Sequence, residues 1–325
     1  MLIKFFFSLV IALILGFVTL RDIDFNSVYN IQEQVNWVYV IYAIGVMLFI
    51  SILRSIRLKI MLKKIADITI FETFKINSVG YFFIMILPFR IGELAIPILI
   101  RNTYKVPMGS ILSIVMIERV VDLFVLLIIL FSVIYVSLLP PWLIQSAYFL
   151  SIMLIVFSFS VFFLLKKTDL VMKLLNPIFK FLPKVVLEKQ TNLLNGIKLG
   201  LASINTKTQF FYIILIAIIV WMLSAASILL LFWGMRINLG ILEALTVMLI
   251  NVFGISMPAG PGLIGNFQYS CIIALSIFSI DKNVAFSFSM LYYISVLVLT
   301  LFFGILSIYL LRVKSKDLKQ MIESK

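Results

Sequence analysis

The stretch LPFRIGELAIP, at positions 87–97, decides how the chain is organised. It places Arg90 and Glu93 between two apolar runs, SVGYFFIMI before it and ILI after it, and Pro88 and Gly92 accompany the charges. Proline and glycine interrupt helices, and a charged side chain deep in a bilayer is costly unless it is paired. The stretch therefore predicts a break inside an intramembrane segment rather than an ordinary transmembrane helix.

The composition around this stretch is that of a membrane protein. Of the 325 residues, 63% are hydrophobic and 13% are charged, and the mean hydropathy is +1.19. A soluble domain is about half apolar and a quarter charged, and several segments here are long enough to cross a bilayer as helices. The sequence therefore predicts an all-α polytopic membrane protein.

Residue types that usually build catalytic and metal sites are scarce. Histidine is absent, which removes the usual general base near neutral pH and a common metal ligand. The single cysteine, Cys271, can form no intrachain disulfide. We therefore expect no metal, no cofactor and no catalytic residue.

Positive charge predicts the orientation. The chain has 27 Lys and Arg against 14 Asp and Glu, and in so apolar a chain we attribute the surplus to membrane orientation rather than to a nucleic-acid partner. Only Arg21, Arg236 and Lys282 fall on the predicted outer side. Both termini are then cytoplasmic.

Six full spans follow from this assignment. The first resembles a signal peptide but has no small-residue cleavage site after it, so we interpret it as an uncleaved span. The second ends in RSIRLKIMLKK, whose basic residues, Arg54 and Arg57 included, are predicted to form a cytoplasmic patch. The predicted spans cover residues 3–20, 36–53, 108–138, 143–165, 209–233 and 284–311.

Two further apolar segments, 76–100 and 241–280, do not fit as spans. Each lies between flanks that the charge assignment puts on one side of the membrane, and each is interrupted by Pro and Gly near its middle. Both therefore predict re-entrant helical hairpins, which are tolerated only where protein or a wet cavity surrounds them.

The order of segments then repeats. Residues 1–139 and residues 140–311 each read as two spans, a hairpin and a span. Because three crossings per unit is odd, the second unit is predicted to be inverted relative to the first, an architecture that recurs in transporters. A cytoplasmic amphipathic linker at 166–208 and a basic tail at 312–325 complete the predicted organisation.

An ionic cluster is predicted next to the first hairpin. Glu118, Arg119 and Asp122 lie in the span that follows it, with the two acids on one helical face, and they join Arg90 and Glu93 at membrane depth. Such a cluster is either a structural set of salt bridges or a polar substrate-binding cavity in which arginine holds an anionic group.

The second hairpin has no charge at its turn. Its glycines permit tight turning and close backbone approach, and its turn is either a hairpin or gating element or a plain extracellular turn. The residues concerned are Pro258, Gly260, Pro261, Gly262, Gly265, Asn266 and Gln268.

Three motifs together resemble the lysylphosphatidylglycerol synthase transmembrane-region family, whose members are often labelled flippase-like. They are P-x-R-x-G-E at 88–93, E-R-x-x-D at 118–122 and P-x-x-P-G-x-I-G-x-F at 258–267. The resemblance covers nearly the whole chain. Two positions depart from the family pattern: Ile96 replaces a frequent second arginine, and Gly265 or Gln268 replaces a frequent acid.

The resemblance implies movement of an amphiphilic lipid, or of a lipid-linked anionic head group, between leaflets of a bacterial cytoplasmic (inner) membrane. Membrane lipids with anionic or zwitterionic head groups are the implied partners, and pairing of two copies stays open. Because the chain ends soon after its last predicted span, we expect no soluble aminoacyl-transferase domain. Two alternatives are a membrane enzyme that uses Glu93 or Asp122 as a base on a lipid phosphate, and a subunit that presents lipid without transporting it.

Overall fold

The computed structural model describes residues 14–87, 92–136, 206–256 and 260–311, with scattered residues between 141 and 204. Every regular element in these ranges is a helix. Three of the helices are long and apolar enough to cross a membrane, which confirms the all-helical membrane class. They are α3 (Trp37–Leu62), α10 (Lys207–Gly234) and α13 (Lys282–Leu311). The others are α2 (Phe25–Glu33), α4 (Ile70–Ile86), α5 (Ala95–Tyr104), α6 (Met108–Val136), α11 (Ile241–Ser256), the 3-10 helix η2 (Pro261–Leu263) and α12 (Asn266–Ser276).

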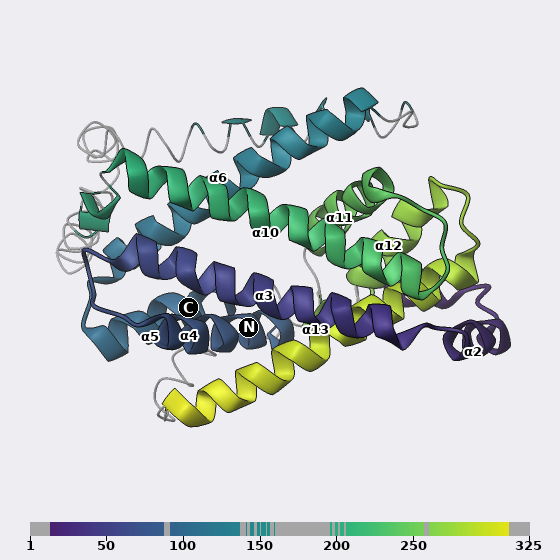
Figure 1. Ribbon diagram of the computed structural model, residues 1–325, viewed down its shortest axis with the longest axis horizontal. Coiled ribbons are helices and arrows are strands. Elements are labelled where there is room, and N and C mark those ends of the chain that lie inside the picture. Colours follow the sequence, from purple (N-terminus) through teal and green to yellow (C-terminus); the bar gives the residue numbers. More distant parts are fainter. Residues whose placement is uncertain are drawn as a thin grey trace, which may run out of the picture.

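Helices α3 and α10 form the centre of the bundle and run side by side along its long axis (Figure 1). The start of α3 is tied to the end of α10 because the Asn36 backbone N–H donates to the Gly234 carbonyl at 2.8 Å. The Asn36 side chain also caps α3 by accepting from the Val38 N–H. The N-terminal end of α3 is therefore fixed against the C-terminal end of α10.

The second predicted span, 36–53, lies within one long helix. Helix α3 continues to Leu62, through the segment that was predicted to be a cytoplasmic patch. The segment is rich in Arg, Lys, Leu and Met, which are good helix formers. One of its basic side chains is buried within the bundle, since Arg57 is only 1% exposed.

Two helix–break–helix units lie at opposite ends of the long axis, α4–α5 at one end and α11–α12 at the other (Figure 1). Helix α4 packs on α5 and α13, while α11 packs on α12, α10 and α6. The predicted breaks in 76–100 and 241–280 are therefore present, although the first unit begins at Ile70 rather than at 76. Thr69 and Glu72 form a capping box there, which moves the helix start toward the N-terminus.

Glycine permits the close approach of chain segments in both units. A Cβ on Gly92 would lie 2.1 Å from the carbonyl carbon of Phe83, so the segment that precedes α5 is in contact with the backbone of α4. In the other unit, Gly262 and Gly265 adopt φ of 75° and 87°, which L side chains rarely tolerate. The Tyr293 hydroxyl of α13 donates to the Gly262 carbonyl at 2.8 Å and holds this turn.

Several predictions fall outside the described residues. These are most of the first span, the hairpin-tip residues Pro88, Arg90 and Pro258, the span at 143–165 except for scattered helical positions, most of the linker at 166–208, and the tail. Helix α2, which was not predicted, occupies part of the connection that was predicted to lie outside. Its Gln32 amide donates to the Ser287 carbonyl of α13 at 2.9 Å.

The α4 cap makes a first testable prediction, because it depends on an ionised carboxylate. The Glu72 carboxylate accepts hydrogen bonds from the Thr69 N–H and hydroxyl, both at 2.8 Å. These bonds, with one from Tyr104, hold the pKa of Glu72 below its ordinary value of 4.5. The stabilisation of the folded protein by this carboxylate is therefore complete above the ordinary pKa of Glu72 and is lost as pH falls through its lowered pKa.

We expect Glu72→Gln to lower the free energy of unfolding by about 0.5–1 kcal/mol at pH 7. The thermal midpoint of this variant should also decline less than that of wild type between pH 6 and pH 3. Parallel decline in both proteins would contradict the role of this cap.

A polar cavity between the helices

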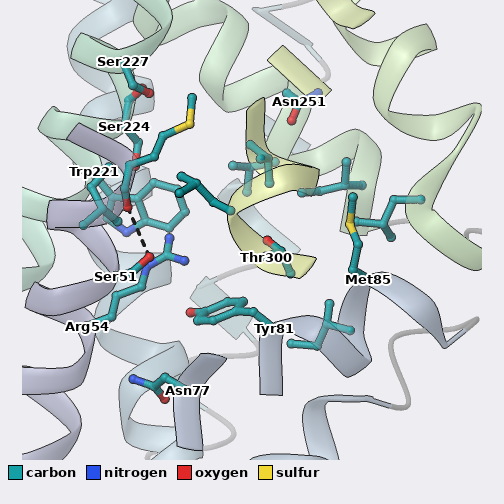
Figure 2. A pocket seen from close by; sticks show the side chains of 18 of the residues that line it. Ser51, Arg54, Asn77, Tyr81, Met85, Trp221, Ser224, Ser227, Asn251 and Thr300 are labelled. Carbon is teal, nitrogen blue, oxygen red and sulfur yellow. Dashed lines mark hydrogen bonds between the residues drawn. The ribbon is translucent and has the colours of Figure 1, made fainter. Parts of the chain in front are cut away.

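A cavity of about 410 Å³ lies inside the bundle. Its wall draws on α3, α4, α6, α10, α11 and α13, so both halves of the chain contribute to it. The wall carries both polar and apolar side chains, and Figure 2 shows a subset of them. The polar lining residues include Ser51, Arg54, Asn77, Tyr81, Glu93, Arg119, Asp122, Trp221, Ser224, Ser227, Asn251, Tyr292 and Thr300.

A buried ion triad borders this cavity. The Arg57 guanidinium donates from Nη1 to Asp122 Oδ1 at 2.5 Å, from Nη2 to Asp122 Oδ2 at 3.0 Å, and from Nη2 to Glu118 Oε1 at 2.5 Å. The forked Arg57–Asp122 pair is the geometry in which guanidinium binds carboxylate best. Helices α3 and α6 are thereby joined within the apolar interior.

This triad corrects the sequence interpretation in one respect. Arg57 was predicted to lie in the cytoplasmic patch, but it is buried and takes both acids of the E-R-x-x-D motif. The signal for this was present in the sequence. Ser51, Arg54 and Arg57 recur at i, i+3 and i+6 on a largely apolar helix, a spacing that places polar groups on one side of the helix.

The structure brings three members of the predicted five-residue cluster to the same cavity. Glu93, Arg119 and Asp122 line it, whereas Glu118 lies behind the lining and bonds to Arg57. Arg90 lies outside the described residues. The E-R-x-x-D motif therefore does bring charged side chains into the interior. Its two acids pair with Arg57, which lies outside the motif.

Arg119 has a different environment from Arg57. It lines the cavity and is half-buried, and within the described part of the chain its buried Nε makes no hydrogen bond. The acids beside it in sequence are bonded to Arg57 instead. Buried nitrogen donors are nearly always partnered in proteins, so this group is available to an acceptor inside the cavity.

Polar residues of the α11–α12 unit hold its turn together. The Gly265 N–H donates to Gln268 Oε1 at 2.9 Å, and the Asn266 amide donates to the Gly254 carbonyl at 3.2 Å. Asn251, which the sequence analysis did not single out, lines the cavity, and its amide contacts Ser270 Oγ at 3.0 Å. Arg54, which was predicted only as part of the cytoplasmic patch, also lines the cavity, as do Trp221 and Asn77, which no sequence motif marks.

These features define an integral membrane protein with a polar chamber inside a helical bundle. Residues 5–304 match the family described as the lysylphosphatidylglycerol synthase TM region, and the chain belongs to this family. The resemblance carried by the three motifs is thereby confirmed. No curated protein and no solved structure matches the chain.

Proposed function

We propose that this protein moves an amphiphilic lipid, or a lipid-linked anionic head group, between the leaflets of a bacterial cytoplasmic membrane. The observation that carries the proposal is the cavity inside the bundle, whose wall carries both charged and apolar side chains. The proposal includes no chemical step on the lipid.

The two kinds of lining side chain suit the two parts of a lipid. Arg119, Glu93 and Asp122 offer charge to a head group, and the Arg119 Nε has no acceptor among the described residues. Apolar lining residues would contact an acyl or prenyl tail. Members of this apolar set are Phe74, Ile84, Met85, Leu263, Val296, Leu299 and Phe303.

The helix contacts support an inverted repeat of the kind found in transporters. In the proposed repeat, α3 corresponds to α10, the α4–α5 unit to the α11–α12 unit, and α6 to α13. Under this exchange the α4–α13 contact corresponds to α11–α6, the α5–α6 contact to α12–α13, and the α3–α4 contact to α10–α11, and all of these occur. The two helix–break–helix units would then enter the membrane from opposite faces as re-entrant hairpins, giving six full spans.

Such an arrangement provides a route for alternating access. Each hairpin contributes to the cavity wall, through Glu93 near the first break and Leu263 in the second. A small displacement of one hairpin or the other would open the cavity to one leaflet at a time. Basic residues at the chain ends and in the linker would orient the protein in the membrane with both termini in the cytoplasm.

Transport in proteoliposomes tests this proposal directly. Purified protein is reconstituted with phospholipids that carry a fluorophore on the acyl chain, which leaves the head group unaltered, and dithionite then measures exchange between leaflets. We expect wild type to exchange at least one phospholipid class faster than protein-free vesicles. Arg119→Gln should slow this exchange by roughly tenfold or more, because hydrogen bonds to charged groups contribute about 1.5–3 kcal/mol.

Arg101→Gln is the matched control, since it removes one positive charge at an exposed position in the last turn of α5. It should exchange lipid at the wild-type rate. Wild-type protein that exchanges no lipid class faster than empty vesicles would overturn the proposal. Equal rates for Arg119→Gln and wild type would remove Arg119 from the transport site.

A further inference from the structure

Arg54 and Trp221 line the cavity from the two central helices. Arg54 projects from α3 and Trp221 from α10, and Figure 2 shows both side chains pointing into the cavity on the side where α3 and α10 pack. Ser51 and Ser224 lie one helical turn from them and line the same cavity.

Arg54 carries a positive charge that no acid in the described ranges neutralises. No carboxylate of the described residues lies within ion-pair distance of it, whereas Arg57, one turn further along α3, takes both Glu118 and Asp122. Its guanidinium carbon lies 5.1 Å from the centre of the Tyr81 ring, so an aromatic face is its nearest stabilising contact. A cation held over a ring in an enclosed site retains most of its donors for a ligand.

Trp221 adds a second donor without an acceptor. Its indole Nε1 is buried, and within the described ranges it makes no hydrogen bond. Nearby hydroxyls donate within their own helices, Ser51 to the Met47 carbonyl at 3.1 Å and Ser224 to the Val220 carbonyl at 2.7 Å. An indole N–H can only donate, so the group that satisfies it must bring a hydrogen-bond acceptor.

These observations select the chemistry of the ligand. Two donors from two helices, one of them positively charged, suit a group with at least two acceptor oxygens and a negative charge. An ammonium group would be repelled by Arg54. In a phospholipid the phosphodiester has this chemistry and lies at the junction of head group and tail, and the cavity wall carries both polar and apolar side chains.

Helix geometry places this site at a depth similar to that of Arg119. Arg54 lies nine residues before Lys63 on α3, and Arg119 lies eleven residues after Met108 on α6. At 1.5 Å per residue these separations are about 14 Å and about 16 Å from the ends predicted to be cytoplasmic. One head group in the cavity can therefore approach both arginines.

We propose that Arg54 and Trp221 form a phosphate subsite on the α3–α10 side of the cavity, which binds the phosphodiester of a phospholipid. The subsite deepens the proposed function, because it names the group by which the transported lipid is held. It assigns a binding role to an arginine outside the family motifs and to the indole N–H opposite it.

Binding measurements with soluble probes test the subsite independently of transport. Dihexanoyl phosphatidylglycerol is titrated into detergent-purified protein by calorimetry, with dihexanoylglycerol, which lacks the phosphate, and inorganic phosphate as separate titrants. We expect the phospholipid to bind and dihexanoylglycerol to bind at least roughly tenfold more weakly. Inorganic phosphate that binds as tightly as the phospholipid, with the same dependence on Arg54, would assign the subsite to free phosphate and overturn the lipid assignment.

Three variants connect the binding to these residues. Arg54→Gln should weaken phospholipid binding by roughly tenfold to a hundredfold, and Arg54→Lys should recover part of the loss. Trp221→Phe keeps the ring but removes the N–H, and should weaken binding about three- to tenfold. Lys63→Gln, at the exposed C-cap of α3, removes the same charge from the same helix and should bind as wild type does.

The outcomes separate this subsite from the proposed function. If Arg54→Gln and Trp221→Phe are folded and bind the phospholipid as wild type does, the subsite is wrong whatever the transport assay shows. If they weaken binding while wild type exchanges no lipid between leaflets, the subsite stands and the transport proposal fails. Should Arg54→Gln not fold, the affinities of Arg54→Lys and Trp221→Phe decide, and wild-type values for both would overturn the subsite.

Discussion

Replacing Arg57 by methionine is expected to destabilise the protein by about 3–5 kcal/mol, which is the cost of removing one partner from a buried ion pair. Methionine approximates the length of the arginine stem, so the loss should arise from charge rather than from an empty space. Without Arg57, the carboxylates of Glu118 and Asp122 keep their burial but lose the guanidinium that binds both. Two neighbouring negative charges would then remain in the interior without the arginine that pairs with both.

Unfolding in sodium dodecyl sulfate, followed by circular dichroism, measures this effect. The decisive comparison is the triple variant Arg57→Met, Glu118→Gln, Asp122→Asn, which removes the charges that the single change strands. We expect it to recover most of the lost stability, since buried ionic groups replaced together by neutral ones are often tolerated. A single variant as stable as wild type, or a triple variant no more stable than the single one, would contradict the pairing.

Gly92→Ala is expected to destabilise the α4–α5 unit by roughly 3 kcal/mol or more, the upper end of the cost of overpacking. An alanine Cβ at this position would lie 2.1 Å from the Phe83 carbonyl carbon and 2.2 Å from the Ile84 nitrogen. Both neighbours are backbone atoms, so no side-chain rotation can relieve the clash. Glu93, the next residue, would move away from the cavity that it lines.

The same unfolding assay, with proteolysis of the α4–α5 connection as a second readout, tests this change. Gly45→Ala on α3 is the matched control, because a Cβ there meets no atom within 4 Å. That variant should be neutral or up to about 1 kcal/mol more stable, since alanine favours a helix over glycine. If Gly92→Ala unfolds together with wild type and Gly45→Ala, the described approach of the two segments is wrong.

Arg57 and Gly92 both influence the cavity. Arg57 binds the acids that would otherwise neutralise the arginines of the cavity wall, and Gly92 lets the chain approach closely enough to bring Glu93 to that wall. These two residues, whose roles are structural, thus determine which charged side chains of the cavity wall remain available to a ligand. A variant that disturbs either one is expected to alter transport through the cavity as well as stability.

Much of the organisation could be predicted from local features. The apolar content indicated the membrane class, and Pro and Gly indicated the two breaks in otherwise helical segments, because backbone restrictions act within a few residues. The E-R-x-x-D motif and Glu93 pointed to charged residues that do approach the same interior region. Each of these inferences depended on composition or on spacing along one element.

The tertiary structure decided which partner each charge has. Arg54 and Arg57 belong to one basic run in the sequence, yet one lines the cavity and the other is buried against α6. Asp122 lies three residues after Arg119 but bonds to Arg57, which is 65 residues away. Ion pairing and unsatisfied donors depend on how helices pack, and packing is a property of distant segments, whereas hydropathy and helix breaking are properties of neighbouring residues. The sequence by itself therefore determined the class of protein and the positions of its breaks, and only the packing of α3, α6 and α10 determined which arginines a ligand can reach.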